Sequence, residues 1–304
     1  PAPSTFDAEP FVLDCRGHAL DCRPGQPLGA HVMGILNVTP DSFYDGGQYT
    51  AVEDAVARAE AMINEGAAII DIGGESSRPK GSVYGEGASA VPADEELDRV
   101  LPVVEALAER FPETLLSIDT YKPAVARRAL EAGAHLINDI TGLRVFPEMA
   151  EVVAEYGAPL IVMHSLGRPG AMPHTQDYGD VAAAVNASLE ESLSIAEDAG
   201  VEHLVVDPGF GFGKTAAENL RLINTVDMLL ALERPVLVGI SRKSTVGAVL
   251  GTPDDPAPKD KRLFGSLGVT AVAVLRGATI VRTHDVRPTV EMLRALGATW
   301  TTER

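Results

Sequence analysis

Polar and charged side chains follow a series of apolar runs along this chain, at the point where each run ends. The runs have the length and composition of β-strands and cover 32–37, 68–73, 115–119, 136–140, 159–164, 203–207, 235–240 and 279–283. The groups at their ends are Asn37, Asp71, Asp119, Asn138 with Asp139, His164, Asp207, Ser241 to Lys243, and Arg282 with His284. A single Asp or Asn at such a point is explained as a helix N-cap, which fits both Asp119 and the Asn138–Asp139 pair. Hydrogen-bonding groups at all eight ends favour a ligand site at one rim of a barrel.

One set of these residues consists mainly of hydrogen-bond acceptors. Asp119, Asn138 and Asp207 offer carboxylate and amide groups, and Lys243 can neutralise one of the carboxylates. Buried carboxylates persist only when they are paired or hydrogen-bonded. A ligand with adjacent N–H donors, such as the edge of an aminopyrimidine or a guanidine-like group, would satisfy them.

The other set is cationic. Arg282 and His284 follow the last apolar run, and they flank Asn37 if the eighth strand closes on the first. Arg78 lies on a loop of Gly and Ser residues, and together these cations predict a pocket for phosphate or pyrophosphate.

A hard cation fits the same region. Asn37, with Asp41 or Asp119 nearby, offers the oxygen ligands that Mg²⁺ prefers alongside a phosphate. The two sets and the cation predict an enzyme that acts on a flat, nitrogen-rich, phosphorylated substrate.

The segment 31–47 joins the first strand to a polar loop. Residues 31–38 form an unbroken apolar run, which is typical of a strand buried on both faces, and Pro and paired Gly then mark a loop. Phe43 and Tyr44 interrupt this loop. They either cap the core or belong to a flap that closes over a flat substrate.

Helical patterns alternate with the strands. Thr50 with Glu53, and Thr215 with Glu218, have the spacing of capping boxes, and Gly66 is expected to end the first helix. The other predicted helices cover 94–110 with a kink at Pro102, 123–132, 148–156, 180–199, 261–277 and 287–296. The last residues of the Thr215 pattern extend to Leu230, and 251–261 is read as a surface insertion rich in Pro and Asp.

Eight strands in alternation with helices predict the α/β class, as a single (β/α)₈ TIM barrel with an N-terminal β-hairpin. An open doubly wound sheet is the alternative, but no GxGxxG follows the first strand, and GFGFGK at 209–214 lacks the spacing of a phosphate loop. The hairpin is expected over 11–23, around Gly17, as a plug at the barrel bottom. We therefore expect an extension with a hairpin in 1–30 and the barrel in 31–304.

Composition limits the partners and the compartment. The chain has 304 residues, 45% of them hydrophobic, and a formal net charge of −18, which argues against nucleic acid and anionic membranes as partners. No apolar run approaches the roughly 18 residues of a membrane span, and no signal peptide is recognised. Cys15 and Cys22 could face each other across the hairpin, but two surface or half-buried thiols in a reduced cytosol are favoured, so we expect a cytoplasmic protein.

Seven segments carry a resemblance to a known family. They are MGILNVTPDSFYDGG (33–47), DIGGESSRP (71–79), SIDT (117–120), INDI (137–140), DPGFGFGK (207–214), GISRKS (239–244) and RTHDV (282–286). In this order, over residues 31 to 286, they resemble dihydropteroate synthase. The resemblance implies a pterin-binding TIM-barrel transferase of folate biosynthesis, which condenses 6-hydroxymethyl-7,8-dihydropterin pyrophosphate with p-aminobenzoate and releases pyrophosphate. It also implies Mg²⁺ as cofactor and a homodimer, with small-molecule substrates as the partners.

The resemblance also implies roles for individual residues. The pterin would be bound by Asp119, Asn138, Met163, Asp207, Arg242 and Lys243, and the pyrophosphate by Asn37, Arg282 and His284. The p-aminobenzoate pocket would comprise Phe43, Ser77, Arg78, Pro79, Phe212 and Ser244, and Mg²⁺ would bind Asn37 and Asp41. Residues expected to act in catalysis are Asp45, Lys243, Arg282 and His284; Asp45 is a candidate to stabilise a pterin methylene cation or to guide the proton of the amine.

Two departures from the family pattern stand out. Tyr44 replaces a small residue in the first loop, and 164–176 only loosely resembles the usual loop after the fifth strand. Two rival functions remain open at this point. A corrinoid-dependent methyltransferase domain shares the barrel but needs no pyrophosphate pocket, and a non-catalytic paralogue would bind pterin without turnover.

Overall fold

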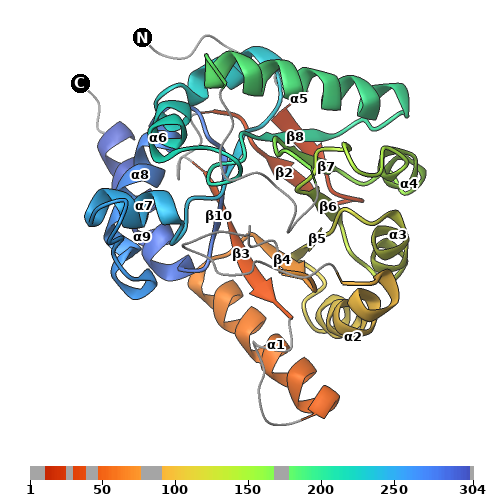
Figure 1. Cartoon of the computed structure of the whole chain (residues 1–304). Coiled ribbons are helices and arrows are strands. Elements are labelled where there is room, and N and C mark those ends of the chain that lie inside the picture. Colours follow the sequence, from red (N-terminus) through yellow and green to blue (C-terminus); the bar gives the residue numbers. More distant parts are fainter. Residues whose placement is uncertain (1–10, 25–29, 39–46, 77–90, 168–177, 302–304) are drawn as a thin grey trace.

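The structure is a computed structural model, and it describes residues 11–24, 30–38, 47–76, 91–167 and 178–301 (Figure 1). Predicted site residues in the gaps, namely Asp41, Phe43, Asp45, Ser77, Arg78 and Pro79, together with Tyr44, lie outside the described residues. None of the helices in the described ranges is long and apolar enough to cross a membrane.

Eight parallel strands form the centre of the molecule. They are β3 (His31–Asn37), β4 (Ile69–Gly73), β5 (Leu115–Asp119), β6 (Leu136–Asp139), β7 (Leu160–Met163), β8 (Leu204–Asp207), β9 (Leu237–Val238) and β10 (Ile280–Thr283). Their order is β8-β7-β6-β5-β4-β3-β10-β9, so the last strand of the chain pairs with the first strand of the sheet. The ring closes through a parallel bridge between Val206 and Val236, with the Val206 N–H donating to the Pro235 carbonyl at 3.0 Å. The predicted barrel is confirmed, and the open doubly wound sheet is excluded.

Helices surround this ring on the outside (Figure 1). They are α1 (Gly47–Glu65), α2 (Ala93–Arg110), α3 (Pro123–Glu131), α4 (Met149–Glu155), α5 (Val181–Asp198), α6 (Ala216–Asn224), α7 (Ser244–Leu250), α8 (Leu263–Leu275) and α9 (Val286–Thr301). Short 3₁₀ helices cover η3 (Val226–Leu232) and η4 (Lys259–Lys261). Each connection between parallel strands therefore crosses the outer surface, as βαβ units require.

Most helix boundaries agree with the sequence, with four exceptions, one of which is that α9 ends at Thr301 and not at the predicted residue 296. The Thr215–Glu218 capping box is present, and Gly66 follows the end of α1 with φ +105°. The predicted start at Thr50 is wrong, because α1 already begins at Gly47. Leu230 belongs to the separate η3, since the chain leaves the α-helix at Thr225, and α7 was not predicted.

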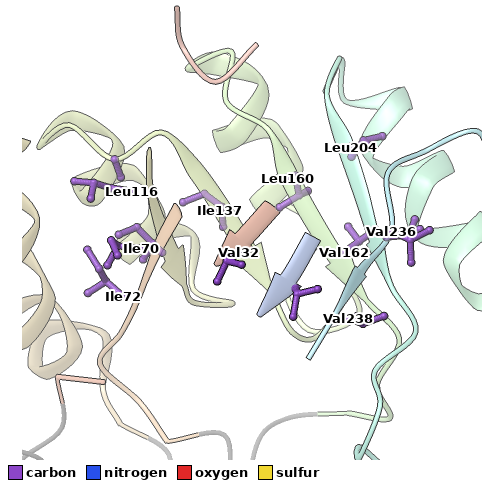
Figure 2. Packing of buried hydrophobic residues seen from close by; sticks show 14 of the residues in the cluster. Val32, Ile70, Ile72, Leu116, Ile137, Leu160, Val162, Leu204, Val236 and Val238 are labelled. Atoms are coloured by element: carbon purple, nitrogen blue, oxygen red, sulfur yellow. The ribbon is translucent and has the colours of Figure 1, made fainter. Parts of the chain in front are cut away.

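The main core lies between the strands and the helices. Side chains such as Val32, Ile70, Ile137 and Val162 point outward from the ring into this layer (Figure 2). Because side chains alternate along a strand, the neighbours of these residues point into the barrel interior. The lowest interior layer is apolar and has one residue from each strand: Met33, Ile69, Leu115, Leu136, Ile161, Val205, Leu237 and Ile280.

The N-terminal hairpin closes the barrel below this layer, as predicted. Its strands β1 (Val12–Asp14) and β2 (Ala19–Asp21) are antiparallel, and Gly17 between them has φ +96°. Leu13, Cys15, Leu20 and Cys22 join the apolar cluster of the lowest layer. Both cysteines are free and buried, so the expectation of surface or half-buried thiols is wrong. Both cysteines are buried because the inward face of the hairpin packs against the apolar residues at the bottom of the barrel.

Candidate active site

The candidate site is built on the interior layer immediately above the apolar one. Two positions further along each strand, the interior residues are Ile35, Asp71, Ser117, Asn138, Met163, Asp207, Gly239 and Arg282. This layer lies near the carboxyl ends of the strands, where barrel enzymes place their active sites. Asn37 and Asp119, another two positions along β3 and β5, extend it upward to the rim. Sequence positions more than 200 residues apart thus meet in one interior surface.

An arginine bridges two carboxylates in this layer. Arg282 Nε donates to Asp71 Oδ2 at 2.5 Å, and its Nη2 donates to Asp119 Oδ2 at 2.6 Å. Asn138 Nδ2 donates to the same Asp71 oxygen at 3.3 Å. The amide oxygen of Asn138 and the second oxygen of Asp119 are then available as acceptors for a ligand.

A second cation lies beside Asp207. The Lys243 ammonium donates to the Phe210 carbonyl and lies 4.4 Å from the centre of the Phe212 ring. Asp207 accepts the Gly209 N–H at 2.7 Å and attracts Lys243 electrostatically. Gly211 lies so close to Lys243 that a Cβ at this position would be 2.7 Å from the lysine Cδ. The Gly-rich segment after β8 is therefore a close-fitting support for Lys243 and not a phosphate loop.

Burial shifts the protonation of these groups. It raises the pKa of Asp119 to about 7, although Arg282 acts to lower it and Asp71 acts to raise it. Burial also raises the pKa of Asp207, against the attraction of Lys243, and it lowers the pKa of Lys243 to about 8. Perturbed titration of several neighbouring groups is a property of functional sites.

An apolar surface adjoins the acceptors. Ile140, Met163 and Phe212 form a small cluster separate from the two larger cores. Met163 and Phe212 were predicted to contact the pterin and the p-aminobenzoate respectively. A flat ring placed here would have acceptors at its edge and apolar atoms against its face.

His284 and Arg242 lie near the ends of β9 and β10. His284 Nδ1 is 3.1 Å from Ser241 Oγ, and burial lowers the pKa of His284 to about 4, so this imidazole is neutral at pH 7. The expectation that His284 is a cation is therefore wrong, although its ring can still donate a hydrogen bond to an anion. Arg242 has φ +57°, and its Nε donates to Asp285 Oδ2 at 2.9 Å. The guanidinium of Arg242 is thus bonded to Asp285. Stacking of Arg242 on a pterin stays a prediction. Ser244 is the first residue of α7, directly after the site lysine.

Asp71 and Asp139 both follow apolar runs, but only Asp71 belongs to the site. Asp71 was named as a strand end but was not assigned to the site, although it lies at its centre. Asp139, by contrast, points outward. Its oxygens accept from Thr141 and Leu143 in the turn that follows β6, and α4 begins only at Met149, so the helix N-cap interpretation is wrong for this residue. It is also wrong for Asp119, because the N-cap of α3 is Lys122. Alternation along β4 and β6 was the signal that could have separated the two.

The donor set for Mg²⁺ is sparse in the part of the chain that the structure describes. Asn37 is exposed at the end of β3, and no group of three His, Cys, Asp or Glu side chains suited to a metal occurs in those ranges. Mg²⁺ commonly takes one or two protein ligands together with substrate phosphates and waters. The residues present therefore fit a magnesium ion held largely by a bound pyrophosphate.

Comparisons with known proteins agree with this geometry. A family model described as "Pterin binding enzyme" matches residues 33–284. The dihydropteroate synthase of Escherichia coli K12 is 48% identical over 271 residues, covering 88% of this chain and 91% of the relative. A structure of the Xanthomonas albilineans dihydropteroate synthase with 4-aminobenzoic acid superposes with a TM-score of 0.84 at 42% identity, covering 96% of this chain and 99% of the other. Another, in complex with 7,8-dihydropteroate, has a TM-score of 0.80 at 40% identity and covers 96% and 100%.

Proposed function

The chain belongs to the dihydropteroate synthase family of pterin-binding enzymes, and we infer from this that it is a transferase that makes 7,8-dihydropteroate. It condenses 6-hydroxymethyl-7,8-dihydropterin pyrophosphate with p-aminobenzoate and releases pyrophosphate. The observation that carries this function is the interior surface at the carboxyl ends of the strands, where Asp119, Asn138 and Asp207 gather beside Arg282 and Lys243. It combines acceptors for a nitrogen-rich ring with cations for a charged leaving group.

Recognition of the pterin follows from the acceptors. A dihydropterin presents adjacent N–H groups at its edge, and Asp119, Asn138 and Asp207 offer oxygens to receive them. Lys243 balances Asp207 and donates to acceptor atoms of the ring, while Met163 packs against its face. Because these groups are buried, a ligand that left them unpaired would bind far more weakly.

The chemical step depends on charge and position. The bond between the pterin methylene carbon and the pyrophosphate oxygen breaks, and a new bond forms from that carbon to the amine nitrogen of p-aminobenzoate. Arg282 and His284 bind and orient the departing pyrophosphate, and the buried carboxylates favour the positive charge that develops on the pterin. The amine loses one proton on attack, and Asp45 is our candidate to guide it. An aryl amine is already nucleophilic in its neutral form, so no strong general base is required.

The other assignments in the loops are part of the same proposal. Phe43, Ser77, Arg78, Pro79, Phe212 and Ser244 form the p-aminobenzoate pocket, with Arg78 placed to pair with the carboxylate of that substrate. Asn37 and Asp41 hold Mg²⁺, which supplies charge neutralisation for the pyrophosphate when it is bound. Two free thiols agree with a reduced compartment, and we place the protein in the cytoplasm.

We also propose a homodimer through α8 and the neighbouring α7. Phe264, Gly268, Val272 and Leu275 follow one another at helical spacing, and all are exposed, Phe264 by 83%. Val249 and Leu250 on α7 add two more exposed apolar side chains. An apolar face of this kind on a soluble domain indicates an association surface, and the partner proposed here is a second copy of the chain.

The dimer is tested by sedimentation of two variants. Phe264→Glu should shift the protein to a monomer, because it buries a charge at the centre of the proposed contact. Met228→Glu, which changes an exposed apolar residue of η3, should leave the dimer intact. A Phe264→Glu variant that sediments like the unaltered protein would exclude this surface.

The reaction is tested by measuring pyrophosphate release with and without p-aminobenzoate. We expect release that requires p-aminobenzoate and that matches the dihydropteroate formed. Pterin binding without release would indicate a non-catalytic paralogue. A methyltransferase of the corrinoid-dependent class would release no pyrophosphate at all.

A further inference from the structure

Asp71 occupies the centre of the site layer without a role in the proposed reaction. It is fully buried in β4, two positions above the apolar Ile69. Its Oδ2 accepts from both Arg282 Nε at 2.5 Å and Asn138 Nδ2 at 3.3 Å. Its Oδ1 has no hydrogen-bond partner among the residues that the structure describes.

Such a carboxylate is costly for the fold. A buried charge with an unpartnered oxygen loses solvation that its remaining bonds do not fully restore. The layer below shows that the same strands accept an apolar residue at every interior position. Residues that break a folding rule of this kind are concentrated at functional sites.

Both partners of Asp71 belong to the proposed recognition set. Because Asn138 donates its Nδ2 to Asp71, its carbonyl oxygen is the amide atom left to accept from a ligand. Because Arg282 gives Nε to Asp71 and Nη2 to Asp119, one edge of the guanidinium is fixed between two strands. Its Nη1 bonds neither carboxylate and is left for an anion.

We propose that Asp71 is a positioning residue for the pterin pyrophosphate, which orients the Asn138 amide and the Arg282 guanidinium together through one carboxylate oxygen. Asp71 itself touches no substrate in this account. The inference rests on the function proposed above, because the two groups it orients are assigned to the pterin edge and to the pyrophosphate. It predicts a specific loss for one substrate and not a general loss of structure.

The first experiment compares Asp71→Asn with Asp139→Asn in steady-state kinetics. Both residues are fully buried carboxylates, on β4 and β6, but Asp139 points outward and accepts from Thr141 and Leu143 in the turn after β6. Asp71→Asn should lower kcat/KM for the pterin pyrophosphate by about 100-fold, the loss typical of misplaced binding groups. The KM for p-aminobenzoate should change by less than about threefold, and Asp139→Asn should change neither constant by more than that. Equal losses for both substrates, or equal effects of the two variants, would overturn the proposal.

The second experiment asks whether Asp71 acts through its two partners. Asp71→Asn is combined with Asn138→Ala and, separately, with Arg282→Lys, which removes the Nε donor. If Asp71 works by orienting these groups, its effect on kcat/KM should be smaller in each background, because one of the two groups that it orients is already altered. A full 100-fold effect in both backgrounds would mean that Asp71 acts elsewhere and would contradict the proposal.

Folding and function are controlled separately. Thermal unfolding of each variant identifies any that are not folded at the assay temperature, and Asp71→Ser, which removes the buried charge with a smaller side chain, then replaces Asp71→Asn. Pyrophosphate release by the unaltered protein is measured first. Absence of that release would defeat the proposed reaction, whereas normal release with an Asp71 variant that behaves like Asp139→Asn would defeat only this inference.

Discussion

The two ends of the barrel interior are built from the same eight strands and differ in almost every other respect. At the amino ends, eight apolar side chains pack against the hairpin, and Arg16 Nη1 donates to the Leu130 and Ala134 carbonyls at 2.8 and 2.5 Å. At the carboxyl ends, Asp71, Asp119 and Asp207 crowd around Arg282 and Lys243, with shifted pKa values for several of them.

The difference separates stability from binding within one fold. The lower end removes apolar surface from water, so it stabilises the barrel. The upper end holds three carboxylates and the basic side chains of Arg282, Lys243 and Lys214 out of water, which costs stability and leaves acceptors ready for a ligand. Substitutions at the lower end should therefore mainly change the free energy of unfolding, and substitutions at the upper end should mainly change ligand affinity.

The largest expected effect is that of Asp207→Ala at the upper end. The substitution removes a carboxylate proposed to accept N–H groups of the pterin, and it takes away the negative charge that attracts the buried Lys243. Hydrogen bonds to charged groups contribute about 1.5–3 kcal/mol each, so the loss of two should lower pterin affinity by about 100-fold or more. Isothermal titration with a pterin ligand measures this. Asp207→Asn keeps an acceptor for the Gly209 N–H and serves as the control for folding. Near-normal binding by Asp207→Ala would exclude this residue from the pterin site.

An intermediate effect is expected in the pH dependence of stability. The pKa of Asp119 is raised by burial from 3.8 to about 7, so between these values the folded state binds more protons than the unfolded one. The contribution of Asp119 to the unfolding free energy therefore falls as pH rises from about 4 to 7. Asp119→Asn should remove this fall, measured as Tm against pH. An unchanged Tm profile in the variant would contradict the raised pKa.

The lower end should show the opposite dependence on pH. Burial, with His18 and Arg16 nearby, lowers the pKa of His135 from 6.5 to about 4. The unfolded state then binds more protons, so the His135 contribution rises with pH over that window. Between pH 4 and 6.5 His135 therefore opposes Asp119, whereas His284 at the upper end, whose pKa is also lowered to about 4, acts in the same direction as His135. His135→Gln should remove the His135 contribution from the profile of Tm against pH, and an unchanged profile would contradict the lowered pKa.

The smallest expected effect on activity is that of Arg16→Ala in the hairpin. It removes two hydrogen bonds to carbonyls at the end of α3 and should lower the unfolding free energy by about 1–2 kcal/mol. Denaturant unfolding measures the loss, and kcat and both KM values should stay unchanged. A marked change in kcat would show that the two ends are coupled, which the comparison does not allow.

Much of this architecture was readable from the sequence, because local patterns determine it. The eight strands, the Thr215 capping box and the Gly17 hairpin depend on neighbouring residues, and they were predicted correctly. Asp71 was not assigned to the site, because the position of a residue at a strand end does not by itself show which face its side chain takes. The alternation of side chains along the strands places Asp71 inward and Asp139 outward. The burial of Cys15 depends on where the hairpin docks, which no local pattern records.

Other features depend on closure of the ring. The Arg242–Asp285 ion pair joins the segments after β9 and β10, and its partners are 43 positions apart in the chain. The roles of the site residues, the magnesium ligands and the boundary at residue 30 stay predictions. The fold, the family and the gathering of Asp119, Asn138, Asp207 and Arg282 at the carboxyl ends of the strands are shown by the structure and the comparisons.

The central claim is that the carboxyl-end layer receives the pterin, and a crystal structure of this protein with a bound pterin analogue tests it most directly. We predict the ring edge within hydrogen-bonding distance of Asp119, Asn138 and Asp207, with one face against Met163. A pterin bound anywhere else on the protein, with these three side chains bonded only to one another and to water, would contradict the account.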